Sequence, residues 1–146
     1  MWGAENLRPG ATVWLTENYI DAMLLMERHP DYVGLAVGGA SIWRDEWTKV
    51  LADSKPGRVV VILDNDLAGQ ATGRTLAKLQ AERTAKAKAA GRTLPPIYPA
   101  GPKLANRLRK AGISAHLFPW PVDSPAKADL GWLLMQGPTD AEDKNP

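Results

Sequence analysis

The sequence contains no cysteine, which excludes disulfide bonds, zinc–thiolate sites and cysteine nucleophiles. The two histidines, His29 and His116, lie far apart in the chain, so a histidine-rich metal site is not expected. There is no run of about 18 apolar residues, the length that a membrane-spanning helix needs. The first ten residues, MWGAENLRPG, lack the basic and apolar regions of a signal peptide. We therefore expect a soluble, cytoplasmic protein.

The charges of this chain are unevenly distributed, although its net charge is only +2. Residues 1–66 contain ten acidic and six basic residues, whereas residues 74–110 contain ten basic residues and Glu82 as their one acid. Such segregation is typical of a polyanion-binding surface beside an acidic site. A long solvated helix rich in Lys and Arg would give the same pattern, so charge alone leaves both interpretations open.

Four apolar segments are expected to form β-strands. The run RVVVIL is continuous and β-branched, which suits a strand buried on both faces, as in a parallel sheet. The segment ATVWLT is equally apolar, and two further segments are weaker strand candidates. In chain order the four expected strands are residues 11–16, 32–37, 58–63 and 114–118.

Helical patterns fill the intervals between these strands. Apolar residues recur at helical spacing, and glycine or proline residues mark several ends. The expected helices are residues 19–28, 41–52, 68–90, 103–111 and 129–136. Alternation of strands and helices predicts an α/β fold with about four mainly parallel strands flanked by helices. We expect a single domain over residues 1–136, followed by a polar tail at 137–146.

Two carboxylates follow the most apolar strand directly. Asp64 and Asp66 are two residues apart at its carboxyl end, where open α/β sheets place their ligands. Two close carboxylates repel each other unless a cation or a shared proton lies between them, and a hard divalent ion is the natural partner. The alternative is that Asp66 caps the helix that follows, which would explain one of the two acids.

A third carboxylate follows the other strong strand. Glu17 comes directly after ATVWLT, and Asp21 lies one helical turn further on the same face. The parallel sheet would bring Glu17 to the same edge as Asp64 and Asp66. For each of these acids alone, a structural role near the start of the helix is an equally good explanation.

These residues resemble the Toprim family. Residues 17–22, Glu-Asn-Tyr-Ile-Asp-Ala, are similar to its first motif, Glu-Gly-x-x-Asp-Ala, and residues 64–69, Asp-Asn-Asp-Leu-Ala-Gly, to its second, Asp-x-Asp-x-Ala-Gly. Between them, residues 36–41 resemble the glycine turn after the second strand of the family. Order, spacing and strand context agree over roughly residues 11–136, in the form seen in bacterial and phage primases.

The resemblance includes one departure and one looser match. Asn18 stands where the family has glycine; asparagine tolerates left-handed backbone geometry, so we expect the turn to be kept. Lys127-Ala128-Asp129 resembles the late Lys-Asp motif of primase-type members with one residue inserted. Asp129 could be a further metal ligand or the N-cap of the last helix.

The resemblance implies a role for each acidic residue. Asp64 and Asp66 would hold Mg²⁺, with Mn²⁺ as a possible substitute. Glu17 would be the general acid/base or a bridging metal ligand, and Asp21 and Asp129 would support the site as additional ligands. In the family these groups make or break phosphodiester bonds.

A nucleic-acid backbone would then follow the basic side chains. Trp120, between two prolines, is the best candidate for an exposed base-stacking platform. The implied partners are a single-stranded DNA template and nucleoside triphosphates, together with a helicase or other replication domains, and no membrane. The residues expected to contact nucleic acid are Arg74, Lys78, Lys103, Arg107, Arg109, Lys110 and Lys127.

Four functions remain open from the sequence. The first is a primase-like nucleotidyltransferase that makes RNA primers as part of a larger replication assembly, because the zinc module of such primases needs cysteines that this chain lacks. The second is a nuclease with the same carboxylates, and the third is a non-catalytic nucleic-acid-binding domain. The fourth is a response-regulator-like or phosphatase-like domain in which Asp64 accepts a phosphoryl group.

Overall fold

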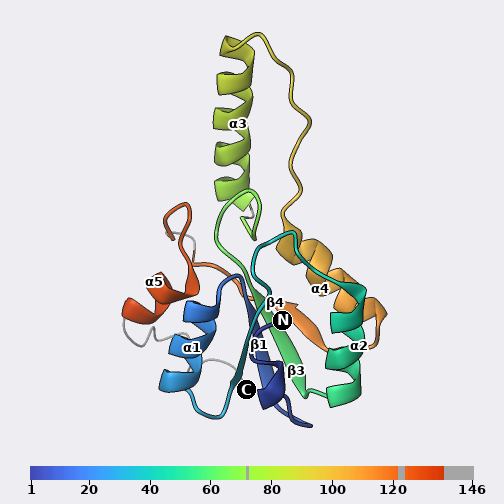
Figure 1. Cartoon of the computed structure of the whole chain (residues 1–146). Coiled ribbons are helices and arrows are strands. Elements are labelled where there is room, and N and C mark those ends of the chain that lie inside the picture. Colours follow the sequence, from blue (N-terminus) through green and yellow to red (C-terminus); the bar gives the residue numbers. More distant parts are fainter. Residues whose placement is uncertain (72, 122–123, 137–146) are drawn as a thin grey trace.

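The computed structural model describes residues 1–71, 73–121 and 124–136, and for residues 73 and 74 of these it describes the backbone alone. It has three layers: a central sheet, α1 and α5 on one face, and α2 and α4 on the other (Figure 1). No helix in these ranges is long and apolar enough to cross a membrane. In chain order the elements are η1 (Ala4–Asn6), β1 (Thr12–Thr16), α1 (Tyr19–Arg28), β2 (Val33–Ala36), α2 (Asp45–Ser54), β3 (Arg58–Ile62), α3 (Gly73–Ala89), α4 (Ala100–Lys110), β4 (Ala115–Leu117) and α5 (Leu130–Met135).

The sheet is four-stranded and entirely parallel, with the strand order β2-β1-β3-β4. The expected α/β fold and all four expected strands are confirmed, each within two residues at either end. After β1 the chain passes to β2 on one side and then to β3 on the other. The gap between β1 and β3 at their carboxyl ends is therefore a topological switch point, where ligands bind in such sheets.

The larger part of the core lies between the sheet and the helices α2 and α4. Val13, Leu15 and Val61 are fully buried on this face. They pack in one cluster with Leu51 of α2 and Leu108 of α4. Because successive strand residues point to opposite faces, the intervening residues of the same strands form the second half of the core.

The opposite face of the sheet packs against α1 and α5 and is rich in aromatic residues. Trp14 of β1 stacks on Tyr32, with ring centroids 5.8 Å apart, and lies 5.8 Å from Phe118. Leu25 of α1 and Leu130 of α5 complete this cluster. The interaction between α1 and α5 matters for function, because both helices begin at the carboxyl edge of the sheet.

Four of the five expected helices need corrected boundaries, and only 19–28 has both ends right. The second helix begins at Asp45 rather than residue 41 and ends at Ser54, because residues 38–44 form the glycine turn and its exit. The fourth begins at Ala100, three residues early, because Pro102 in its first turn needs no N–H partner. The fifth is one residue shorter at each end.

The third helix begins at Gly73 rather than residue 68, and it projects from the body as an arm (Figure 1). Residues 67–70 form a turn that precedes it. The chain returns along the arm through residues 90–99 and enters α4, and Ala100 N donates to Ala68 O at 2.8 Å. The arm therefore rises from the carboxyl edge of the sheet, beside the loop that follows β3.

Candidate metal-binding and catalytic site

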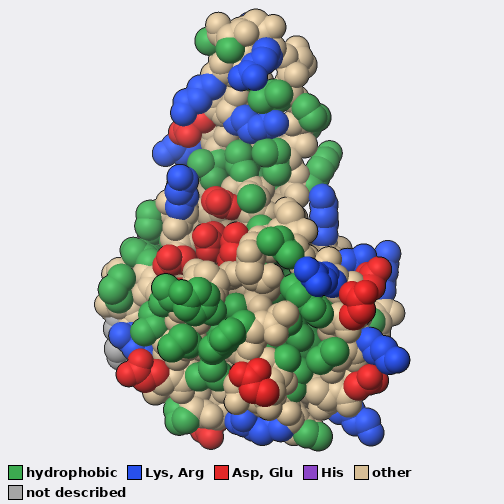
Figure 2. Space-filling model, in the orientation of Figure 1, with side chains coloured by type: hydrophobic (Ala, Val, Ile, Leu, Met, Phe, Trp, Pro, Cys, Tyr) green, Lys and Arg blue, Asp and Glu red, His purple; other side chains and the backbone are tan. Residues whose placement is uncertain are grey.

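Glu17 and Asp64 lie beside each other at the switch point of the sheet. Thr16 pairs with Ile62 across β1 and β3, so Glu17 is level with Leu63 and Asp64 is one residue further along. Figure 2 shows acidic side chains gathered where the arm meets the body, with Lys and Arg on the arm. The chain thus brings carboxylates from both motifs to one edge, as the parallel sheet requires.

One oxygen of Glu17 is held by the glycine turn after β2. The main-chain N–H of Ala40 donates to Glu17 Oε1 at 3.1 Å, and Gly38 N donates to Glu17 O at 2.9 Å. The other oxygen, Oε2, is buried without a hydrogen-bond partner among the described residues. A buried carboxylate oxygen that lacks a partner is costly, so this atom is well placed to receive a cation or a proton.

The loop after β3 shapes the second pair of carboxylates. Asp66 Oδ1 accepts hydrogen bonds from Ala68 N at 2.9 Å and Gly69 N at 2.7 Å. Asp66 therefore caps the tight turn of residues 67–70, and its second oxygen stays available. Gly69 is required in this turn, because a Cβ there would lie 2.3 Å from Asp64 O. Neither side-chain oxygen of Asp64 accepts a hydrogen bond from the described residues.

Burial and the acidic surroundings at this edge of the sheet raise the pKa of Asp64. Partial burial is the largest cause that raises its pKa, and the nearby negative charges of Glu17, Asp66, Asp129 and Asp21 raise it further, to about 7. Charges affect one another in this way only when they are close, so the five acids form one electrostatic group. A bound divalent cation would lower this pKa again, because its positive charge would offset the accumulated negative charge.

Asp21 and Asp129 are placed differently from the other three acids, since both receive N–H groups from the start of α5. Asp129 is the N-cap, with Oδ1 accepting from Trp132 N at 2.7 Å, and Asp21 Oδ1 accepts from Gly131 N at 3.0 Å. Burial and then the charge of Asp129 raise the pKa of Asp21, while its hydrogen bonds lower it. These two acids thus join α1 to α5, and only Asp129 keeps an oxygen, Oδ2, that accepts no hydrogen bond from the described residues.

The side chain of Asn18 connects the start of α1 to Asp21. Its side-chain oxygen accepts from Asp21 N at 2.9 Å, and its amide nitrogen donates to Asp21 Oδ2, also at 2.9 Å. Its backbone is extended, with φ −119° and ψ 160°, so the chain turns into α1 here without left-handed geometry. Asparagine serves here as a helix N-cap that also orients Asp21.

The donor set at this edge fits a hard divalent ion. Carboxylate oxygens are the preferred ligands of Mg²⁺, and Glu17 Oε2, the Asp64 carboxylate and one Asp66 oxygen are free to serve. In the described ranges, no three acidic or histidine side chains already surround a common point where a metal could sit.

The expected nucleic-acid contacts divide between two parts of the molecule. Lys127 is exposed beside the acidic loop, since its N–H donates to Asn65 O at 2.9 Å and Asn65 N donates to Ala128 O at 2.8 Å. Lys103 lies in the first turn of α4, which touches the same loop, and Lys78 lies on the arm. The side chain of Arg74 falls outside the described residues.

The remaining basic residues lie toward the opposite edge of the sheet. Arg109 Nε donates to Ala115 O at 2.7 Å, at the start of β4. Ala115 pairs with Val59, five residues before Asp64, which is about 16 Å along a strand. Arg107 is held by Asp45 of α2 at 3.0 Å, and Lys110 is the last residue of α4. The basic residues of 74–110 are therefore divided between the arm with the start of α4 and the end of α4 near the start of β4.

Trp120 does not form the exposed platform that its flanking prolines indicated. Its ring is half-buried against Phe118 in an edge-to-face contact with centroids 5.6 Å apart. Its Nε1 donates to Leu63 O at 3.1 Å. Trp120 thus covers the end of β3 and helps to hold the strand from which the acidic loop departs.

Gln70 is a residue that the sequence analysis missed. It is 1% exposed; its Oε1 accepts from Leu63 N at 3.2 Å, and its Nε2 donates to Phe118 O at 2.6 Å. The side chain thereby joins the ends of β3 and β4 directly behind the acidic loop. No local signal in the sequence marks Gln70, which is followed by Ala71, Thr72 and Gly73.

The comparisons with known proteins agree with this geometry. A family model described as Toprim-like matches residues 14–95, which is more than half of the chain and runs from within β1 through β2 and β3 to the return segment of the arm. No curated protein and no solved structure matches the chain.

Proposed function

Because this chain belongs to the Toprim-like family, we propose that it is a Mg²⁺-dependent nucleotidyl-transfer domain of the primase type, working on nucleic acid within a larger replication assembly. Domains of this family generally bind Mg²⁺ through acidic residues and act on nucleic acids. The observation that carries the proposal is Glu17 Oε2, which is buried without a hydrogen-bond partner among the described residues and belongs to the acid that helps to raise the pKa of Asp64.

In this proposal the carboxylates have different roles. Asp64 and Asp66 would hold the ion, with Asp21 and Asp129 as outer support; bound Mg²⁺ would neutralise charge on the phosphoryl group. Glu17 would take the proton of the attacking hydroxyl at Oε2, while Ala40 fixes its Oε1. A bond forms between the hydroxyl oxygen and the α-phosphorus of a nucleoside triphosphate, and the bond to the leaving pyrophosphate breaks.

The contact between the late Lys-Asp segment and the acidic loop supports the primase type over the nuclease. Lys127 and Ala128 exchange main-chain hydrogen bonds with Asn65, between the two aspartates. An exposed ammonium group beside the acidic loop would suit the triphosphate of an incoming nucleotide, and this supports the proposal. A nuclease has no triphosphate to neutralise, so it has less use for this cation.

The first test is Mg²⁺ and Mn²⁺ binding by calorimetry on the wild type and on Asp64→Asn/Asp66→Asn. A matched control is Asp31→Asn/Asp53→Asn, because both of these side chains are exposed outside the acidic group. We expect binding in the wild type and the control and its loss in the site variant, with circular dichroism unchanged. Absence of binding in the wild type, even with single-stranded DNA present, would overturn the proposal.

The second test separates primer synthesis from cleavage. The wild type is incubated with Mg²⁺, a single-stranded DNA template and labelled nucleoside triphosphates, and in parallel with an end-labelled strand alone. Short labelled oligonucleotides that require the template and disappear in Asp64→Asn/Asp66→Asn would support the primase type. Shortening of the labelled strand without synthesis would favour the nuclease instead.

A further inference from the structure

The arm formed by residues 73–99 has little support from the rest of the domain. Among the described residues, α3 shares no extensive interface with another helix or strand. It is held by its own return segment, through Gln80 Nε2 donating to Ile97 O at 2.8 Å and Arg83 Nη1 donating to Pro95 O at 2.6 Å. Most of the stability of helices in proteins comes from tertiary packing, so a projecting helix of this kind gains from a binding partner.

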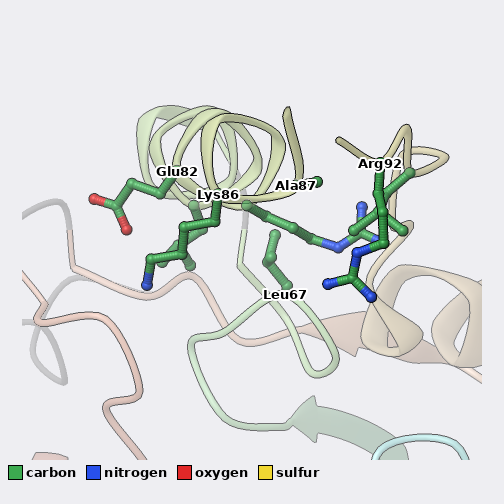
Figure 3. Close-up of a pocket in the computed structure, with 8 residues that line it drawn as sticks. Leu67, Glu82, Lys86, Ala87 and Arg92 are labelled. Atoms are coloured by element: carbon green, nitrogen blue, oxygen red, sulfur yellow. The ribbon is translucent and has the colours of Figure 1, made fainter. Parts of the chain in front are cut away.

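An open groove runs along this arm. It encloses about 340 Å³ and combines the cations Arg83, Lys86 and Arg92 with an apolar floor. Figure 3 shows Lys86 and Arg92 on either side of Leu67. The residues that line the groove are Leu67, Leu79, Glu82, Arg83, Lys86, Ala87, Arg92 and Leu94.

The charge of the arm identifies the chemistry of its partner. Residues 73–99 contain six basic residues and Glu82 as their one acid. Lys86 and Arg92 are exposed and make no salt bridge with the described residues. Unpaired cations on a projecting element attract a polyanion, and the leucines of the floor suit the apolar faces of sugars and bases.

The groove also begins at the acidic site. Leu67 lies between Asp66 and the Ala68 and Gly69 N–H groups that Asp66 caps, so one wall of the groove belongs to the loop of the second motif. A strand that follows the arm toward the body is therefore delivered to the carboxylates. The cationic groove and the acidic site are thus connected by one short turn, residues 67–70.

We propose that the groove of this arm binds single-stranded nucleic acid and guides it to the acidic edge, an inference that rests on the proposed action on nucleic acid. Arg83, Lys86 and Arg92 neutralise successive phosphates, while Leu67, Leu79 and Leu94 contact sugars and bases. A duplex turns its bases inward and would leave the leucines uncovered. The groove is also at the small end of ligand pockets, a size that suits one or two nucleotides.

The test measures binding of a fluorescent 20-nucleotide oligo(dT) by anisotropy across a salt series, in EDTA so that the metal site plays no part. The groove variant is Lys86→Gln/Arg92→Gln, which keeps the side-chain hydrogen bonds of Gln80 and Arg83 that hold the arm. The matched control is Lys55→Gln/Arg58→Gln, which removes one Lys and one Arg that are exposed at the amino edge of the sheet. A duplex of the same length is measured alongside.

We expect the groove variant to bind about tenfold more weakly at 0.1 M salt, with the slope of log K against log salt reduced by about 1.4 for two lost phosphate contacts. The control should keep the affinity and slope of the wild type, and duplex should bind more weakly than the single strand. A groove variant that matches the control, or a duplex that binds as well, overturns the inference and leaves the proposed function standing. If the wild type binds the oligonucleotide through the groove but binds no divalent ion, the proposed function alone is overturned. If the wild type binds no oligonucleotide, both the proposed function and this inference are overturned.

Discussion

Ala40 donates its main-chain N–H to Oε1 of Glu17 across 3.1 Å, from the glycine turn after β2 to the end of β1. This bond leaves Oε2 buried and unpartnered among the described residues, in a carboxylate whose negative charge helps to raise the pKa of Asp64. A rigid turn therefore decides which atom of the glutamate is available for chemistry. The arrangement leads to the first prediction.

Glu17→Gln should weaken Mg²⁺ binding and stabilise the metal-free protein. The amide oxygen can still accept from Ala40, while the negative charge next to Asp64 is removed. We expect affinity to fall by about tenfold or more, as for groups that support a metal, and metal-free stability to rise by about 0.5 to 1 kcal/mol. Calorimetry and urea unfolding in EDTA measure the two effects. Glu27→Gln, on the exposed face of α1, is the control, and equal affinities for the two variants would contradict the prediction.

The stability of the metal-free protein should fall as pH rises from about 4 to about 7, and Asp64 should account for part of this loss. The folded-state pKa of Asp64 is raised from 3.8 to about 7, so over this range the folded state holds a proton that the unfolded state has released. The stabilising contribution is complete below the unfolded pKa and lost once pH exceeds the folded value. Allowing for solvent screening of a half-buried group, the change should be about 1 to 2 kcal/mol.

The measurement is urea unfolding in EDTA at pH 4.5 and pH 7.5. Asp21, whose pKa is also raised, contributes with the same sign, so the comparison of wild type with Asp64→Asn isolates the share of Asp64. Asp53→Asn, at an exposed position in α2, should keep the wild-type pH dependence. If Asp64→Asn lost as much stability with rising pH as the wild type, the assignment of this effect to Asp64 would be wrong.

Asn18→Ala should destabilise the protein by about 1 to 2 kcal/mol, because it removes the N-cap of α1. It also removes the amide that donates to Asp21 Oδ2 at 2.9 Å. Asn18→Ser restores a cap acceptor without that donor, and should recover part of the loss. Guanidinium unfolding of the three proteins gives the comparison, and equal stability of Ala and Ser variants would show that the cap contributes nothing.

The sequence predicts the sheet well because its strands are apolar on both faces, which leaves little ambiguity. The limits of residues 19–28 are right because Asn18 and Pro30 delimit that helix on each side. The start of α3 is misplaced because Asp66 caps a turn of four residues, and such a turn has the same local signals as a helix start. The acids of both motifs meet at one edge, as expected, because parallel strands align their carboxyl ends.

The basic residues show what local sequence cannot predict. Residues 74–110 look uniform, yet α4 runs back along the sheet and carries Arg109 to the start of β4, while α3 carries Lys78 and Lys86 out along the arm. These charges are separated because the two helices run in different directions relative to the strands. The composition of a segment contains no information about the direction of its helices in the fold. Similarly, the partners of Asp21 and Gln70 lie 110 and 48 residues away, so only the folded chain brings them together.

Gln70→Leu should destabilise the protein by about 2 to 3 kcal/mol, because it leaves two buried main-chain groups without partners. Those groups are Leu63 N and Phe118 O, at the ends of β3 and β4. The change keeps the volume of the side chain close to that of glutamine, so the loss reports the hydrogen bonds rather than a cavity. Gln80→Leu is the matched control, since Gln80 also donates to a carbonyl but holds only the arm. It should leave the unfolding midpoint almost unchanged, and a loss of equal size in both variants would show that Gln70 has no special role in holding the acidic loop.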